Sequence, residues 1–204
     1  MAGLVLVTGA TGFIGRATVA SLEQAGWVVI RGVRSASRSS GDAEIYLDLN
    51  NPAEILALEN GARFDAIVHL GAHVGWYGAT EAEMFAPNIL ATGCLAFLAS
   101  KWNARLVYAS AAIVCGVKSE MIDANTPVFA DTAYAQSKLL AEQLIEASNV
   151  PHCILRIGGV FGANGPAHLG LNRAIDEALK GNPPLQSGSG AVLRNYIYVK
   201  DVAA

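Results

Sequence analysis

The sequence predicts an α/β protein in which helices cover both faces of a parallel sheet. Three observations support this class. Short apolar runs alternate with longer segments of helical period along most of the 204 residues, as in βαβ units. The hydrophobic fraction of 52% can form a large core, and the charged fraction of 15% is low for a disordered chain. A glycine-rich turn also joins the first apolar run to the first helical segment, which favours a doubly wound sheet.

The elements follow from these patterns in chain order. Six apolar runs are predicted as strands: Leu4–Thr8, Trp27–Val33, Glu44–Leu47, Ala66–Leu70, Leu106–Ala109 and Cys153–Ile157. Three longer segments between them are predicted as helices: Ile14–Gln24, Glu81–Lys101 and Ala133–Ser148. The stretch RSASRSSG, Arg34–Gly41, is rich in serine and arginine and is predicted as an exposed loop.

The amino-acid composition of the chain changes after Gly162. The Gly/Pro-rich stretches GANGPAHLG and GNPPLQSGSG flank one short predicted helix, Leu171–Leu179. We therefore expect a main domain over residues 1–162 and a smaller substrate-side lobe over residues 163–204. The chain ends in YIYVKDVAA, just where another helix begins, so the lobe is expected to be truncated.

Composition argues against several classes of partner. A net charge of −3 gives no electrostatic reason to expect nucleic acid or an anionic membrane. No apolar run reaches the roughly 20 residues of a membrane span, and no signal peptide is predicted. The cysteines lie in apolar segments and are predicted as reduced thiols of a cytoplasmic protein: Cys94, Cys115 and Cys153. His69 and His73 have no carboxylate or cysteine at ligand spacing, so no metal site is predicted.

The turn VTGATGFIG spaces three glycines as G-x-x-G-x-x-G between a strand and a helix. Glycines here allow a tight turn, close approach of a pyrophosphate, and close packing of helix on strand. The helix N-terminus then favours the anion. A glycine triplet also occurs in turns that bind nothing, but the strand–turn–helix context favours a dinucleotide site. The expected cofactor residues of the turn are Gly9, Thr11, Gly12, Phe13, Ile14 and Gly15.

The end of the second strand bears on which dinucleotide binds. NAD sites usually place an acidic residue there, whereas an arginine suits the 2′-phosphate of NADP. Val33 occupies the acid's place and Arg34 follows, with Ser35 and Arg38 as further candidates. A solvated arginine at a strand end is the alternative. NADP is therefore favoured, and NAD stays open.

Further motifs follow in a fixed order. They are Asp48-Leu49 after the third strand, HLGA (His69–Ala72) after the fourth, Asn88 in PNILATGCLAFL, YAQSK (Tyr134–Lys138), LRIGGVFG and RNYIYVKDVA. Together with TGATGFIG, this order resembles the extended short-chain dehydrogenase/reductases of the NAD(P)-dependent epimerase/dehydratase family. The resemblance extends over essentially the whole chain and implies a Rossmann-type fold.

The resemblance also implies roles for individual residues. Asp48 and Leu49 would contact adenine, and Leu70, Gly71 and Ala72 would lie along the cofactor. Asn88 would support the site next to the cofactor. On the substrate side the matching motifs contain Gly159 and Arg194. Family members also tend to dimerise through paired helices, here Glu81–Lys101 and Ala133–Ser148.

Tyr134 and Lys138 form the pair that carries catalysis in this resemblance. They are four residues apart on a predicted helix and so share one face. A free tyrosine has a pKa near 10, and a nearby ammonium is expected to lower it. Such a tyrosine can exchange a proton with a substrate alcohol or carbonyl while hydride moves to or from the nicotinamide. By resemblance, Lys138 also holds the nicotinamide ribose.

A third catalytic group, a serine or threonine, is missing from its usual place. The family pattern resembles S-S-x-x-V-Y-G, and counting back from Gly116 in LVYASAAIVCG puts its second hydroxyl at Ala111. Ser110 matches the first, supporting hydroxyl. A lost donor to the reacting oxygen costs about 3 kcal/mol. Either the Tyr/Lys pair works alone and slowly, or a shift of the loop brings Ser110 in.

Two functions follow. The first is an NAD(P)-dependent oxidoreductase or epimerase that transfers hydride to or from a carbonyl or alcohol. Gly159 stands where nucleotide-sugar members commonly carry an asparagine, so the substrate is a nucleotide sugar or a small ketone. The second is an NADP-binding protein with little or no turnover, a sensor or scaffold, which Ala111 favours.

Overall fold

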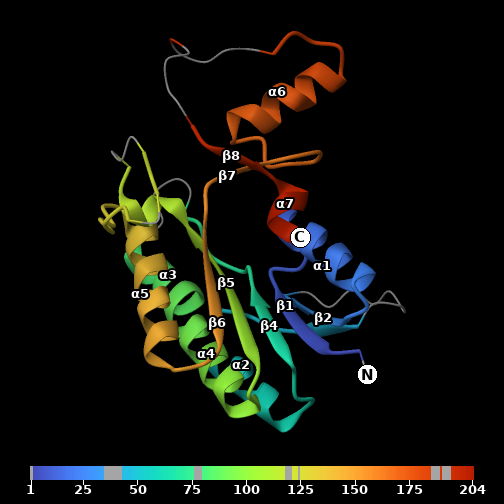
Figure 1. Cartoon of the computed structure of the whole chain (residues 1–204), viewed down its shortest axis with the longest axis vertical. Helices are drawn as coiled ribbons and strands as arrows, with labels where there is room; N and C mark the ends of the chain where they lie inside the picture. The colour runs from blue at the N-terminus through green and yellow to red at the C-terminus, as the bar shows by residue number, and fades with distance from the viewer. Residues whose placement is uncertain are drawn as a thin grey trace.

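The computed structural model describes residues 2–34, 43–75, 80–117, 121–123, 125–184, 189 and 194–204. Most of the predicted Ser/Arg-rich loop, with Ser35 and Arg38, lies outside the described residues. Within them the chain is an α/β fold with one large parallel sheet and a smaller two-stranded sheet (Figure 1). The predicted fold class is confirmed.

The large sheet has six strands in the order β3-β2-β1-β4-β5-β6, and every neighbouring pair is parallel. The strands are β1 (Leu4–Thr8), β2 (Val28–Val33), β3 (Glu44–Tyr46), β4 (Ala66–His69), β5 (Arg105–Ala111) and β6 (His152–Ile157). In such sheets a ligand binds outside the carboxyl ends of the strands where the order reverses, here between β1 and β4. All six predicted strands are present, with ends shifted by a few residues.

Helices cover both faces of this sheet (Figure 1). One face carries α2 (Pro52–Ala57), α4 (Ala91–Trp102) and α5 (Ala133–Ala147). Helices α1 (Phe13–Gln24) and α7 (Val199–Ala203) pack together on the other side. Short helices fill the connections: 3-10 turns at Leu58–Asn60 and Ala112–Cys115, and α3 (Glu81–Met84) before α4. Helix α2 was not predicted, because six residues are too few to show a helical period.

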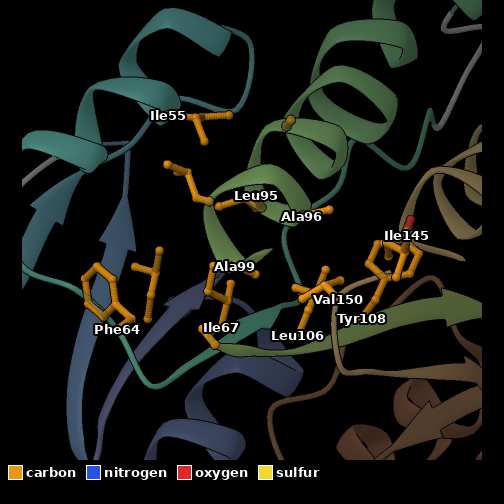
Figure 2. Packing of buried hydrophobic residues seen from close by; sticks show 14 of the residues in the cluster. Ile55, Phe64, Ile67, Leu95, Ala96, Ala99, Leu106, Tyr108, Ile145 and Val150 are labelled. Atoms are coloured by element: carbon orange, nitrogen blue, oxygen red, sulfur yellow. The ribbon is translucent and has the colours of Figure 1, made fainter. Parts of the chain in front are cut away.

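The main core lies between the sheet and the α2–α4–α5 layer (Figure 2). Leu106 and Tyr108 of β5 meet Leu95 of α4 and Ile145 of α5, all fully buried. On the opposite face, a smaller cluster joins β1 to Val19 of α1. Alternate residues of β1 therefore serve different cores, as the period of a strand requires.

The long helix predicted over Glu81–Lys101 is interrupted. Between α3 and α4 the chain forms a π-helical turn, Phe85–Leu90. Pro87 lies inside this turn and has no N–H to donate, so a regular α-helical ladder would be broken there in any case. Such turns are frequent at functional sites. Here the turn contains the buried Asn88.

Strand β5 is longer than predicted. Ser110 and Ala111 were expected in a loop after Ala109, but they continue the strand, paired in register with Arg156 and Ile157 of β6. The parallel partner supplies ladder hydrogen bonds that local sequence preferences do not reveal. The side chains of Ser110 and Ala111 therefore point to opposite faces of the sheet.

The C-terminal part adds a second, two-stranded sheet. Strand β7 (Gly159–Phe161) pairs in parallel with β8 (Tyr196–Tyr198), and α6 (Gly170–Leu179) lies between them in the sequence. Asn172 of α6 ties this part together, because its amide donates to Val160 O and its oxygen accepts from Gly162 N. Helix α7 follows β8 and returns to α1. The boundary at residue 162 stays a prediction.

Candidate active site

The glycine turn follows β1 at the reversal of strand order. Gly9 has a φ of +67°, and a Cβ there would lie 2.7 Å from the backbone nitrogen of Gly71. A Cβ on Gly15 would lie 2.0 Å from the carbonyl oxygen of Gly9. These two glycines are therefore required by the fold itself. At Gly12 a Cβ would meet only the Gly9 oxygen, at 3.1 Å, and Gly12 lines a cavity.

The turn presents donors to that cavity. Gly12 is the N-cap of α1 and makes no side-chain cap hydrogen bond. The first backbone bond of the helix runs from Arg16 N to Gly12 O at 3.0 Å, so the N–H groups of Phe13, Ile14 and Gly15 precede the hydrogen-bonded ladder. These donors and the helix dipole fit a pyrophosphate.

Arg16 adds a positive charge that the sequence analysis missed. Its Nη1 atom donates to the carbonyl oxygen of Thr11 at 2.7 Å, so the guanidinium lies against the glycine turn. An arginine in the first turn of the helix after a glycine loop was the available signal. Its charge complements the donors of the turn.

The expected adenine and ribose residues lie at the same edge of the sheet. Arg34 is exposed directly after β2. The Asp48 carboxylate accepts from the backbone and side-chain nitrogens of Asn50, at 3.0 and 2.9 Å. Leu49 contacts Gly71, where an added Cβ would lie 2.6 Å from Leu49 Cδ1. The structure thus brings the ends of β3 and β4 to the glycine turn.

The buried His69 side chain bridges Thr8 and Thr92 beneath this edge of the sheet. Its Nδ1 atom lies 2.6 Å from Thr8 Oγ1, and its Nε2 atom lies 3.0 Å from Thr92 Oγ1. Gly71 N donates to Thr8 Oγ1, and Thr92 Oγ1 donates to Asn88 O, which fixes the direction of the chain. His69 must then donate through Nε2 and accept at Nδ1, as a neutral imidazole. Burial, and to a lesser extent the charge of Lys138, lowers the pKa of His69 to about 3.

Asn88 connects the loop after β4 to helix α5. Its side chain forms a pair of bonds with the backbone of His73: Oδ1 accepts from the nitrogen at 2.7 Å, and Nδ2 donates to the oxygen at 2.9 Å. Nδ2 also donates to Ser137 Oγ at 2.9 Å. Ser137 precedes Lys138 and donates to Tyr134 O. Asn88 thus joins the loop after β4 to α5, and the role that the resemblance implies for it stays a prediction.

Tyr134 faces the glycine turn across a cavity of about 320 Å³. The walls include the turn from Gly9 to Gly15, Leu70 after β4, and Gly159 at the start of β7. Pro166 and Leu169 of the C-terminal part close another side. Residues far apart in the sequence, including seven of the fifteen expected cofactor residues, thus meet in one cleft. Ala72 follows Gly71 at the same edge and is half-buried.

Lys138 lies below Tyr134 on α5 and is buried. Its Nζ atom donates to Ala109 O at 2.7 Å and lies 4.6 Å from the centre of the Tyr108 ring and 5.9 Å from that of Tyr134. Burial lowers the pKa of Lys138 to about 7, against the opposing effect of Glu142. Burial raises the pKa of Tyr134 to about 12. The sequence analysis expected a lowered value, so that expectation was wrong for the ligand-free chain, in which loss of water outweighs the nearby ammonium.

The hydroxyl of Ser110 is turned away from this pair toward a buried carboxylate. Ser110 Oγ donates to Glu142 Oε1, and the same carboxylate binds Arg156 of β6 at 2.7 Å. Ala111, the next residue, is half-buried at the end of β5. Sequence reasoning missed Glu142, although its position four residues after Lys138 on the same helix face was available.

Of the two substrate-side residues, Gly159 lies in the small sheet and Arg194 lies just before it. Gly159 pairs with Tyr196, and a Cβ on Gly159 would lie 2.9 Å from Tyr196 Cδ1. Arg194 is exposed, two residues before Tyr196. The aromatic ring of Tyr196 therefore occupies the space that a side chain at position 159 would need.

Metal sites and membrane spans are two further classes of feature. Over the part of the chain that the structure describes, no three His, Cys, Asp or Glu side chains gather as metal ligands. One helical stretch in that part, Glu81–Trp102, has the length and mean hydropathy (1.4) of a membrane span, but half of it is buried inside the fold.

Comparison with known proteins decides the family. The model of the NAD dependent epimerase/dehydratase family matches residues 5–204. The chain belongs to this family. Its fold and its glycine turn are those of an extended short-chain dehydrogenase/reductase.

Individual members of the epimerase/dehydratase family differ in the chemistry their names describe. The chain is 32% identical to a dTDP-6-deoxy-L-talose 4-dehydrogenase (NAD(P)(+)) of Kitasatospora kifunensis, over 80% of this chain and 54% of that protein. It is 29% identical to a 3-diazoavenalumate denitrifying reductase of Streptomyces sp., over 97% of this chain and 68% of that one. The chain thus spans about half to two thirds of the length of these relatives.

A solved family structure matches both fold and sequence. MoeE5 in complex with UDP-glucuronic acid and NAD superposes with a TM-score of 0.78 at 30% identity, over 98% of this chain and 70% of that one. A second structure of MoeE5 is a complex with UDP-glucose and NAD. These ligands belong to MoeE5.

Proposed function

We propose that this chain is the cofactor-binding and proton-transfer part of an NAD(P)-dependent oxidoreductase or epimerase of the extended short-chain type. The observation that carries the proposal is the cleft in which Tyr134 faces the glycine turn, with Gly12 open to the same cavity. A helix N-terminus for a pyrophosphate and a Tyr/Lys pair for a proton then lie on the two sides of one space.

The residues divide the work as follows. When bound, the nicotinamide cofactor supplies or accepts the hydride. Tyr134 moves a proton between its phenol oxygen and the substrate oxygen. Lys138, held by Ala109 O, places a positive charge beneath the phenol and favours its ionised form. Asn88 fixes the α5 turn through Ser137, which keeps this pair in register with the cleft.

The cofactor is proposed to be NADP rather than NAD. Arg34 supports this choice, because it is exposed after β2 with no acidic residue at Val33. A guanidinium can bind a 2′-phosphate through paired hydrogen bonds. The relatives name both cofactors, so NAD is the alternative.

The substrate is proposed to be a nucleotide sugar or a small ketone. The names of the dehydrogenase relative and of the MoeE5 complex support a nucleotide sugar. Gly159 and the Tyr196 ring beside it support the smaller substrate, because no asparagine side chain fits there without moving the ring.

A second function, cofactor binding with little turnover, is favoured by one observation. Ser110, the hydroxyl next to the place of the missing catalytic one, is engaged by Glu142. No serine or threonine hydroxyl of β5 then assists Tyr134 and Lys138. The missing hydrogen-bond donor raises the activation barrier by about 3 kcal/mol.

The test is a titration with NADPH and NADH, followed by a turnover assay. Cofactor binding is measured by nicotinamide fluorescence. Turnover is then measured by nicotinamide absorbance with dTDP- and UDP-hexoses and with small aromatic ketones. Tyr134→Phe is the matched control, since it removes only the phenol oxygen. Binding without turnover on any substrate would favour the second function, and absence of binding would refute both.

The proposal includes a homodimer formed through α4 and α5, in a cytoplasmic protein with reduced cysteines. Phe97, Leu140 and Leu144 of these helices are 51%, 47% and 40% exposed, which is high for such large apolar side chains. None of the described cysteines forms a disulfide. Light scattering after gel filtration tests the dimer, with Phe97→Glu expected to yield a monomer.

A further inference from the structure

Glu142 is a buried carboxylate that the proposed mechanism has not used. Its side chain is only 2% exposed. It follows Lys138 by one helical turn and Tyr134 by two, and all three lie along one side of α5. A buried charge needs partners, and those of Glu142 show what it does.

Two elements of the sheet supply these partners. Arg156 of β6 binds the carboxylate in a fork: Nη2 lies 2.7 Å from Oε2, and Nε lies 3.1 and 3.2 Å from the two oxygens. Ser110 of β5 donates its hydroxyl to Oε1. Glu142 is thus buried, while the Arg156 side chain is 38% exposed at the outer strand of the sheet.

We propose that Glu142 is a positioning residue that acts through Lys138: its charge, balanced by Arg156, favours the ammonium form of the buried Lys138 amine, and its carboxylate holds the Ser110 hydroxyl away from the cleft. The catalytic meaning of this inference rests on the proposed function. The electrostatic coupling between Glu142 and Lys138 does not depend on the proposed function.

The electrostatics around Lys138 support this coupling. Burial lowers the pKa of Lys138, and Glu142 is the group that raises it. The other ionisable groups packed around the amine are Tyr134 on α5, Tyr108 on β5, His69 on β4, and Arg156 beyond Glu142 on β6. The tyrosines and His69 are neutral near pH 7, because burial raises the pKa values of both tyrosines and lowers that of His69. Glu142 therefore supplies the negative charge that the ammonium requires.

Arg156 limits this effect. The pKa of Lys138 is about 7, because burial lowers it more than Glu142 raises it. The guanidinium partly offsets the charge of the carboxylate, because it binds the carboxylate directly. Removing Glu142 leaves Arg156 as an unbalanced cation and should make Lys138 easier to deprotonate. Removing Arg156 leaves the carboxylate unbalanced and should make Lys138 harder to deprotonate. The two variants of this ion pair should thus shift the pKa of Lys138 in opposite directions.

The experiment observes Lys138 directly. The chain has five lysines, so lysine labelled with ¹³C at Cε yields five resonances, and Lys138→Arg assigns the one from position 138. In the ligand-free chain, Glu142→Gln should lower the titration midpoint of Lys138 by about 1–3 pH units, and Arg156→Gln should raise it. Glu142→Asp, which keeps the charge, should restore a midpoint near that of the parent. Glu81→Gln, an exposed change on α3, is the matched control and should leave it unchanged.

If the ion pair were purely structural, both variants would be less stable, and the titration midpoint of Lys138 would not shift in opposite directions. An unmoved midpoint in Glu142→Gln would overturn the proposal, as would equal shifts of the same sign in the two variants. If Glu142→Gln does not fold, Glu142→Asp and Arg156→Gln decide, and an unmoved or lowered midpoint in Arg156→Gln overturns it.

Turnover then separates this inference from the proposed function. If a substrate is found, the alkaline limb of kcat against pH should move down in Glu142→Gln and up in Arg156→Gln, with KM changed less than kcat. Opposite NMR shifts without turnover would refute the proposed catalysis and keep the coupling. Turnover in a protein whose Lys138 resonance does not shift would support the proposed catalysis and refute the coupling.

Discussion

Thr8 and His69 end two neighbouring strands, are paired in register, and are also joined by their side chains at 2.6 Å. Beneath the glycine turn, β1 and β4 are thus held together by a bond between side chains as well as by the backbone ladder. The chain continues through Thr92 to Asn88, and every donor in it has one acceptor. This arrangement tolerates only a neutral His69.

The first prediction concerns the acid stability that follows from a neutral His69. Its pKa is about 3 in the fold, below its ordinary value of 6.5. Its contribution to stability is therefore complete above pH 6.5 and is lost as the pH falls through about 3, by about 5 kcal/mol in all. His69→Gln should be less stable than the parent at pH 7, and the difference should shrink at pH 4. Urea unfolding at both pH values measures it, and His73→Gln, an exposed change, should parallel the parent. A constant difference at both pH values would contradict a neutral His69.

The second prediction separates glycines needed for binding from those needed for folding. Gly12→Val should retain the fold and weaken binding of either cofactor by roughly two orders of magnitude, because the side chain would occupy the cavity. Gly15→Ala should instead lower stability by about 1–3 kcal/mol or more, because its Cβ would clash with Gly9 O. Calorimetry and thermal unfolding separate the two effects. Undiminished binding in Gly12→Val would remove the dinucleotide site.

The third prediction tests the choice between NADP and NAD. Arg34→Ala should weaken NADPH binding by about tenfold to a hundredfold and leave NADH binding nearly unchanged, because only NADPH carries the 2′-phosphate. Fluorescence titration with each cofactor measures both affinities. Arg16→Ala is the comparison: it lies by the glycine turn, so it should weaken both cofactors to a similar extent. Equal affinities of the parent for the two cofactors would refute the NADP preference.

The fourth prediction concerns the end of β5. Ala111→Ser should raise kcat by up to about a hundredfold with little change in KM, because the new hydroxyl would donate to the reacting oxygen as charge develops there. Tyr134→Phe should lower kcat by about a hundredfold or more while leaving cofactor affinity nearly intact. Initial rates with the best substrate test both.

Ser110→Ala tests whether the Ser110 hydroxyl only binds Glu142 or also serves the reacting oxygen. Since Ser110 donates to Glu142, its loss should lower kcat by less than about tenfold, well short of the loss in Tyr134→Phe. A loss as large as that of Tyr134→Phe would mean that Ser110 serves the reacting oxygen and that Ala111 does not mark its place.

The parts of the fold that repeat with a clear period could be predicted. Strand β1 was predicted to the residue, and α5 to within one residue, because the apolar period and the flanking turns are strong there. Around Asn88 the period predicted one helix, but Pro87 and the bonds to His73 and Ser137 require a wider turn. Those bonds join residues 15 and 49 positions apart, which a local pattern does not contain.

The site shows the same division. The glycine turn and the Tyr134–Lys138 spacing are local motifs and were recognised. The side-chain direction of Ser110 depends on Glu142, 32 residues away, and on Arg156, which is its partner in the sheet. The pKa of Tyr134 was predicted in the wrong direction, because burial is a property of the folded cleft and not of the four-residue spacing.

The packing of α7 on α1 has a consequence for how the chain folds. Phe13 begins α1, and a Cβ on Gly162 would touch both the Phe13 ring and Val199 of α7, at 3.4 and 2.8 Å. Helix α1 therefore stays uncovered on this side until the much later α7 has been synthesised. Contacts of such long sequence separation form slowly, because a large loop must close first. Until that loop closes, the apolar side chains at this contact are open to solvent, and apolar surface exposed during folding favours aggregation.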